Sequence, residues 1–136
     1  MRQELDFNEA PFCSVGKSTV CEGQGLFALK LFLPKSIVVD YSINYKCWKN
    51  CLFEEMPEFN QKYMWWVGVN EQECKLANWN SLFMRANHSK TPNTEWNLKT
   101  KQLIAIASIF PGEEITYNYQ KEIASPSIKL NPPVWI

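Results

Sequence analysis

The segment that most constrains this chain runs from Phe83 to Tyr119 and holds two polar motifs separated by an apolar stretch. The first motif, Asn87–Asn93 (NHSKTPN), is made of residues that favour turns and side-chain hydrogen bonds. The second, Pro111–Tyr119 (PGEEITYNY), begins with a Pro-Gly turn and continues as a short alternating strand. Residues 103–110 between them are rich in β-branched residues and too few for a helix, which predicts a buried strand. The predicted layout is loop, strand, turn, strand.

Taken alone, each motif has a simpler explanation. Asn87-His88-Ser89 followed by Pro92-Asn93 fits a surface turn, and a single histidine is more often structural than catalytic. Glu113 and Glu114 could suggest a metal site or an acid–base pair. Neighbours on a strand face opposite sides, however, so we interpret these two carboxylates as structural.

Together, and in this order, the motifs resemble the two C-terminal signature motifs of the SET-domain protein lysine methyltransferases. A third stretch, Gly23–Ala28 (GQGLFA) followed by Leu33–Tyr41, looks like the opening of that domain. The resemblance covers about Val20 to Tyr119. Many SET enzymes carry a Cys-rich zinc segment after the catalytic tyrosine, and this sequence has no cysteine beyond Cys74. The resemblance therefore implies a compact SET domain without that segment.

The fold implied by the resemblance is mostly β with short helices. Several small sheets form a SET-domain, β-clip-like architecture, and the C-terminal segment is threaded under the preceding loop. We predict a single SET domain over residues 1–136, with a core over about 12–119, a variable insert over about 44–62 and a C-terminal tail over 120–136 that can fold back as a lid.

Local patterns in the sequence predict further elements. Strands are expected over residues 14–21, 26–33 and 37–41, with the glycines at 23 and 25 forming a turn between the first two. In the insert, mixed helical spacings predict a short helix that Pro57 ends. Residues 63–69 and 74–76 are expected to form a strand and its return, and residues 94–101 a hairpin arm.

The resemblance also assigns a site for S-adenosylmethionine. Backbone around the first glycine motif would line the cofactor, where a side chain on either glycine would intrude, and the Asn-His pair would hydrogen-bond its amino-acid part and adenine. Arg85 is included although it lies two residues before Asn87, whereas many members have an arginine three residues before. The expected cofactor-binding residues are Gly23, Gln24, Gly25, Leu26, Arg85, Asn87 and His88.

Two tyrosines are the expected catalytic residues. Tyr119 matches the catalytic tyrosine of the family, with an orienting and electrostatic role, because a phenol with a pKa near 10 stays protonated at neutral pH. Tyr117 matches a position that holds Tyr or Phe against the lysine channel, and a hydroxyl there implies mainly monomethylation. The alternative is that Tyr117 is a core aromatic residue whose hydroxyl reaches solvent or backbone.

Composition limits the partners and the cellular setting. Lys plus Arg equals Asp plus Glu at 14 each, so no global positive field exists to hold nucleic acid. No apolar run approaches the ~20 residues of a membrane span, and the polar N-terminus lacks a signal-peptide apolar region. We expect a soluble intracellular protein, cytoplasmic or, if eukaryotic or delivered to a host, nuclear, whose substrate is a protein or peptide lysine. Its oligomeric state is not determined by the sequence.

The five cysteines are odd in number and irregularly spaced, which argues against a disulfide framework and fits a reducing compartment. Cys47 and Cys51 have a C-x3-C spacing that can bind zinc, but a second pair of ligands is missing. We therefore expect buried or idle thiols and no metal.

Two classes of function fit these features. One is the methyltransferase, favoured because Tyr119, Asn87, His88 and both glycines are present. The other is a non-catalytic SET-like module that binds cofactor or peptide, favoured by the displaced Arg85 and the missing zinc segment.

Overall fold

The computed structural model describes residues 5–55, 66–69, 72–78 and 80–119. Its elements are short, and strands far outnumber helices, so the expectation of a mostly β chain with short helices is confirmed. In chain order the elements are β1 (Cys13–Lys17), β2 (Gln24–Ala28), β3 (Ile37–Asp40), α1 (Ser42–Tyr45), β4 (Lys49–Leu52), the 3-10 helix η1 (Phe53–Glu55), β5 (Trp66–Gly68), β6 (Glu73–Leu76), the 3-10 helix η2 (Leu82–Arg85), β7 (Asn87–His88), β8 (Thr94–Asn97), β9 (Gln102–Ala105) and β10 (Glu114–Tyr117).

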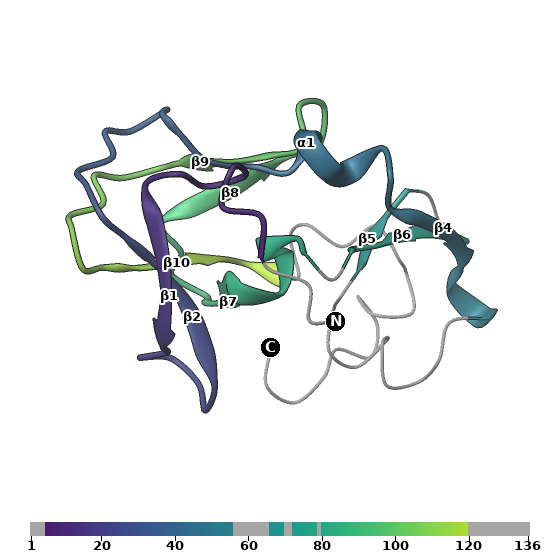
Figure 1. The fold of residues 1–136 in the computed structure, drawn as a ribbon, viewed down its shortest axis with the longest axis horizontal. Helices are drawn as coiled ribbons and strands as arrows, with labels where there is room; N and C mark the ends of the chain where they lie inside the picture. Colours follow the sequence, from purple (N-terminus) through teal and green to yellow (C-terminus); the bar gives the residue numbers. More distant parts are fainter. Residues whose placement is uncertain (1–4, 56–65, 70–71, 79, 120–136) are drawn as a thin grey trace.

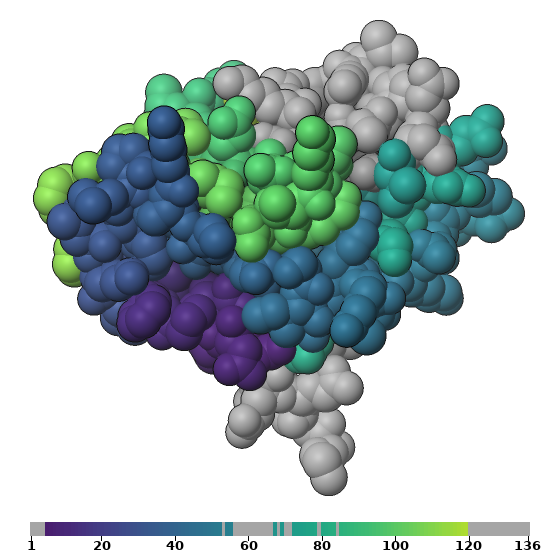
Figure 2. Space-filling model, turned by 90° about the horizontal axis from the view of Figure 1, so that it is seen from above, coloured from purple at the N-terminus to yellow at the C-terminus, as the bar shows by residue number. Residues whose placement is uncertain are grey.

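The strands form three small sheets, with the orders β1-β2-β10-β7, β3-β9-β8 and β4-β6-β5. In Figure 1 the third sheet lies at the right, away from the β1–β2 hairpin at the left. Figure 2 shows the blue segment that contains β3 beside the green segment that contains β9, in agreement with their antiparallel pairing. Several small sheets rather than one large sheet is the arrangement that the SET resemblance implies.

The first sheet brings the three sequence motifs together. β1 and β2 form an antiparallel hairpin, and β10 pairs antiparallel with β2 through Ile115 and Leu26. On its other edge β10 pairs parallel with β7, with Tyr117 opposite His88. Residues 120–136, where the remainder of the predicted threaded segment and the lid fall, lie outside the described residues.

Several predicted strands are shorter in the structure. The strand predicted over 103–110 ends at Ala105; an exposed bend follows, and Ile109 joins Phe32 in an isolated bridge. The two N–O distances of this bridge are 2.8 and 2.9 Å. The strand predicted over 26–33 is also shorter, since β2 ends at Ala28 and Phe32 forms only this bridge. The strand predicted over 14–21 ends at Lys17, because the following serine and threonine turn their hydroxyls onto a carboxylate of β10.

The insert contains more β structure than its sequence pattern predicts. α1 is one turn long, and β4 and η1 follow it where a helix before Pro57 is expected; Pro57 itself lies outside the described residues. The strand predicted over 63–69 is described from Trp66 as β5, and its return is β6. The hairpin arm is β8 with a turn that closes at Lys101, whose φ is 59°.

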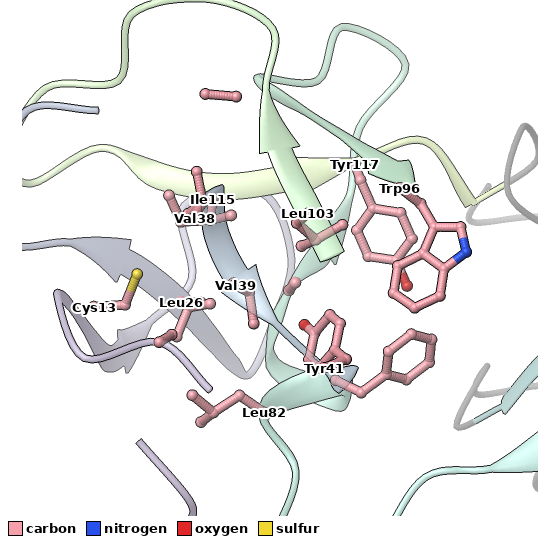
Figure 3. Close-up of a cluster of buried hydrophobic side chains, with 14 of the residues drawn as sticks. Cys13, Leu26, Val38, Val39, Tyr41, Leu82, Trp96, Leu103, Ile115 and Tyr117 are labelled. Carbon is pink, nitrogen blue, oxygen red and sulfur yellow. The ribbon is translucent and has the colours of Figure 1, made fainter. Parts of the chain in front are cut away.

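Among the described residues, a cluster of buried apolar side chains joins the first two sheets and extends to Val67 and Cys74 of the third. Leu26, Val39, Leu103 and Ile115 are fully buried in it, and each such side chain stabilises the fold by roughly 1.5–3 kcal/mol. In Figure 3 the aromatic residues gather at the end of this core opposite Cys13. The rings of Phe83 and Tyr41 meet edge to face with centroids 5.3 Å apart, and Trp48 lies 5.2 Å from Phe83. No helix among the described residues is long and apolar enough to cross a membrane.

Candidate active site

Glu114, the first residue of β10, connects the motifs through its carboxylate. Although the side chain is buried, its oxygens accept hydrogen bonds from neutral donors: Thr19 N at 2.6 Å, Thr19 Oγ1 and Ser18 Oγ at 2.8 Å, and Asn87 Nδ2 at 2.9 Å. Burial alone would raise the pKa of this carboxyl, but the hydrogen bonds from Asn87, Thr19 and Ser18 outweigh it and lower the pKa. Glu114 is therefore a charged residue that ties β10 to the turn after β1 and to β7.

Gly25 lies directly against this carboxylate. A Cβ atom at this position would overlap Glu114 Oε2 and would lie 3.3 Å from Asn87 Nδ2, which is a tight contact. The sequence prediction was that a side chain here would intrude on the cofactor; the structure shows that it would first collide with the protein itself. Gly23 is different, because open space surrounds its Cβ position and its φ of +127° is what favours glycine.

Asn87 links the two predicted halves of the cofactor site. Its Nδ2 donates to the carbonyl of Gln24 at 2.8 Å as well as to Glu114. The side chain of Asn87 is half-buried. Gln24 is exposed, whereas the side chain of Leu26 is in the core, so that only the backbone of Leu26 can face a ligand.

His88 is held as a neutral ring. Its Nδ1 accepts a hydrogen bond from the backbone N–H of Tyr119 at 3.1 Å. Burial, and secondarily the charge of Lys90, lower its pKa. A neutral imidazole that accepts at Nδ1 carries its proton on Nε2. That Nε2 is buried without a partner in the described part of the chain, as is Nε of the nearby Arg85.

Tyr119 lies at the centre of the site. The ring is buried, with its centroid 4.7 Å from that of Tyr117 and 5.2 Å from that of His88. Its hydroxyl donates to the backbone carbonyl of Ala86 at 2.7 Å. Burial raises the pKa of this phenol well above its ordinary value, so it stays protonated at neutral pH. The hydroxyl can therefore orient and donate but cannot serve as a base.

The backbone that carries Ala86 is fixed from the N-terminal segment. The carboxylate of Glu9 is fully buried and accepts from Leu82 N at 2.6 Å, from Asn44 Nδ2 at 2.9 Å and from Ser81 Oγ at 3.1 Å. Burial raises the pKa of Glu9 despite these bonds. The start of η2, and with it the approach to Ala86, is thus positioned by a residue outside the motifs.

Tyr117 and Tyr41 form the apolar side of the site. Tyr117 is buried, with its ring centroid 6.3 Å from that of Phe83. The hydroxyl of Tyr41 is buried, and no partner for it lies among the described residues; burial, then Glu9 and Tyr119, raise its pKa. Sequence reasoning missed Tyr41 as a site residue, although it is the last residue of the matched opening stretch. In Figure 3 Tyr41, Trp96 and Tyr117 lie close together at this end of the core.

The structure thus brings most of the predicted site residues together around the β7–β10 pairing. Asn87, His88, Tyr117 and Tyr119 meet there directly, and Gln24 and Gly25 reach it through Asn87 and Glu114. Arg85 ends η2 next to Ala86, and Gly23 lies in the exposed turn before β2. Among the described residues, no group of three or more His, Cys, Asp or Glu is placed to hold a metal ion.

A fold of several small sheets, with a buried tyrosine beside an Asn-His segment, defines a SET-type domain. The SET domain profile matches residues 23–120, which is most of the chain. This chain therefore belongs to the SET-domain family. No curated protein sequence matches it.

Solved structures agree with this assignment at the level of the fold. A Plasmodium falciparum protein described as a candidate histone methyltransferase is similar at 21% identity and a TM-score of 0.53, over 79% of this chain and 91% of that one. CpSET8 from Cryptosporidium is similar at 19% identity and a TM-score of 0.55, over 79% of this chain and 56% of that one. A chain of ctPRC2, in an autoinhibited conformation bound to S-adenosylmethionine, is similar at 20% identity and a TM-score of 0.63, over 90% of this chain and 16% of that one.

Proposed function

We propose that this chain is a methyltransferase that transfers a methyl group from S-adenosylmethionine to a lysine side chain of a protein or peptide. The observation that carries the proposal is the 2.7 Å hydrogen bond from the hydroxyl of Tyr119 to the carbonyl of Ala86. Ala86 directly precedes the Asn87-His88 pair. One hydrogen bond therefore joins the proposed catalytic tyrosine to the segment proposed to bind the cofactor.

The residues present fit the cofactor. Asn87 and His88 are half-buried, and the side chain of Asn87 donates to the backbone carbonyl of Gln24 at the start of β2, so the two cofactor motifs meet at Asn87. Buried donors at His88 Nε2 and Arg85 Nε, which lack partners among the described residues, are groups that a polar ligand can satisfy. In this proposal the backbone of Gly23–Leu26, together with Arg85, Asn87 and His88, holds S-adenosylmethionine.

When bound, S-adenosylmethionine would supply a methyl group on a positively charged sulfonium, whose carbon a neutral amine could attack in line with the neutral thioether as the leaving group. Tyr119 orients the reacting atoms through its protonated hydroxyl, which Ala86 fixes in place. Backbone carbonyls such as that of Ala86 can hold a polarised methyl group by weak C–H···O contacts. The protein's main contribution is proximity and the line of attack.

The aromatic end of the core supplies the environment for the lysine. Tyr41, Phe83 and Tyr117 are buried there. An apolar wall disfavours the charged ammonium, whose reference pKa is about 10.4, and so helps the amine to lose its proton. A Tyr117 hydroxyl beside the amine would occupy the space that a methylated amine needs for a second attack, so we propose mainly monomethylation.

Transfer of isotope-labelled methyl from S-adenosylmethionine to candidate proteins and peptides, read by mass spectrometry, tests the proposal. Label on lysine supports it. Cofactor binding without any transfer would support the alternative, a non-catalytic SET-like module that holds cofactor or peptide; the shifted position of Arg85 is the feature that favours that alternative. Absence of transfer, together with absence of binding to cofactor and to peptide, contradicts both functions.

A further inference from the structure

Cys51 and Cys74 lie directly opposite each other on neighbouring antiparallel strands, β4 and β6. The Cys74 thiol donates to the carbonyl of Cys51 at 3.4 Å. Opposite residues of an antiparallel pair have Cα atoms about 4.5–5.5 Å apart. A disulfide needs about 4.4–6.8 Å between Cα atoms, so the backbone need not move for the two sulfurs to bond.

The two thiols differ in access. Cys74 is 1% exposed, whereas Cys51 is half-buried. Cys47, which forms the C-x3-C pair in the sequence, is exposed and precedes β4, outside the ladder that pairs Cys51 with Cys74. The cysteine pair that the fold makes is therefore different from the pair that the spacing suggests.

We propose that Cys51 and Cys74 are a redox modification site that closes reversibly into a disulfide between β4 and β6. This proposal is independent of methyl transfer and does not rest on it. The reaction partner is a low-molecular-weight disulfide of the glutathione type.

The reaction proceeds by two thiol–disulfide exchanges. The Cys51 thiolate attacks one sulfur of the small disulfide, breaks its S–S bond and releases one small thiol. The Cys74 thiolate then attacks the Cys51 sulfur and releases the second small thiol, so that two protein thiols are oxidised and one small disulfide is reduced to two thiols. The two protons lost by the cysteines end on these two products.

The order of attack follows from the surroundings of each sulfur. Burial, and then the neighbouring Cys51, raise the pKa of Cys74 to about 12, so few Cys74 thiols are ionised at neutral pH. Cys51 is the thiol that a reagent can reach. Its position opposite Cys74 gives the second step a high effective concentration, which offsets the scarcity of Cys74 thiolate. The second step should accelerate as pH rises.

The test is peptide mapping of the native protein after equilibration with glutathione disulfide and thiol quenching. Cleavage after Lys and Arg leaves the five cysteines on five different peptides, which span residues 3–17, 18–30, 47–49, 50–62 and 63–75. The expected product is two mass units lighter than the reduced protein and contains a link between peptides 50–62 and 63–75. Because the bond closes a long loop of the unfolded chain, the melting temperature should rise by about 5–10 °C and fall again on reduction.

Cys47→Ser is the matched control, since it removes the cysteine nearest in sequence to Cys51 and should leave the 51–74 link unchanged. The same reaction in concentrated urea should lose its selectivity, because only the folded sheet places the two thiols opposite each other. A Cys51–Cys47 link, a stable glutathione adduct on Cys51 with Cys74 still reduced, or equal selectivity in urea would each overturn the proposal. The three outcomes that would overturn the proposal are measured on wild-type protein, so the test does not depend on whether a Cys74 variant folds.

Discussion

The hydroxyl of Tyr119 donates a 2.7 Å hydrogen bond to the Ala86 carbonyl. Replacing Tyr119 with Phe removes one oxygen and leaves the ring contacts with Tyr117 and His88 in place. We expect methyl transfer to fall by at least about 100-fold, as is typical when one oriented donor at a reacting centre is lost, while cofactor affinity measured by calorimetry changes little. Equal activity in Tyr119→Phe would remove this residue from the mechanism.

Tyr117 determines the number of methyl groups in our proposal. Tyr117→Phe removes the hydroxyl but keeps the buried ring beside Tyr119 and Phe83. The freed space should let a methylated amine rotate for another attack, so the product should shift from monomethyl- toward di- and trimethyl-lysine. Time-resolved mass spectrometry of one peptide with both proteins measures this. Ready trimethylation by the wild type, or identical product ratios, would return Tyr117 to the role of a core aromatic residue.

At the scale of elements, β10 holds the site together because it pairs with β2 on one edge and with β7 on the other. Neither pairing is visible in the periodicity of the chain. The hydrogen bonds of the Glu114 carboxylate need both, since their donors come from the turn between β1 and β2 and from β7. The Asn93 side chain adds a second tie, accepting from Thr116 N at 2.9 Å and donating to Glu114 O at 2.8 Å. The loop after β7 is thereby fastened to β10.

The ionised Glu114 carboxylate should stabilise the fold in a pH-dependent way. Its pKa is lower in the folded than in the unfolded chain, so its contribution is present above the unfolded value of about 4.5 and is lost as pH falls through the folded pKa. Glu114→Gln should cost about 2 kcal/mol near pH 7, because an amide cannot accept from all of these donors. Denaturant titrations should show the gap between wild type and variant shrinking in acid.

Glu9→Gln is the matched control, and its effect on the free energy of unfolding should change with pH in the opposite direction. Because the pKa of Glu9 is raised in the folded chain, ionising this carboxyl lowers the free energy of unfolding. This loss of stability is absent below about pH 4.5 and grows as pH rises through the folded pKa. The difference between wild type and Glu9→Gln should therefore change with pH in the direction opposite to that of Glu114→Gln. Parallel pH profiles for the two variants would contradict the assignment of their charges.

At the scale of the whole molecule, ligand binding should couple to global stability. A ligand held by the native state alone stabilises it by about 2.7 kcal/mol at a concentration 100 times its Kd. For a domain of 136 residues this corresponds to a rise in melting temperature of roughly 10 °C. Both S-adenosylmethionine and its demethylated product should give such a shift by thermal denaturation. No shift at millimolar cofactor would contradict the proposed cofactor site.

Much of this molecule could be predicted from the sequence because the signals are local. The Pro-Gly turn and the strand after it, β10, come from turn chemistry and alternation over a few residues. The motif order identified the family, whose profile covers residues 23–120. Strand ends were less predictable: β9 stops at Ala105, and Ile109 then pairs with the distant Phe32, a contact that no pattern near residue 105 encodes.

The fold family, the aromatic and hydrogen-bonding side chains of the site, and the tyrosines and Asn-His pair proposed to act there can all be read from residue types and their spacing. Four contacts become visible in the folded chain alone: β7 pairs parallel with β10, Glu114 meets Gly25, the Tyr41 hydroxyl is buried at the site, and Cys51 faces Cys74 rather than Cys47. The physical reason is that residue type and periodicity fix what a segment can form, whereas its partner is selected by the burial and hydrogen-bond satisfaction of the whole chain at once.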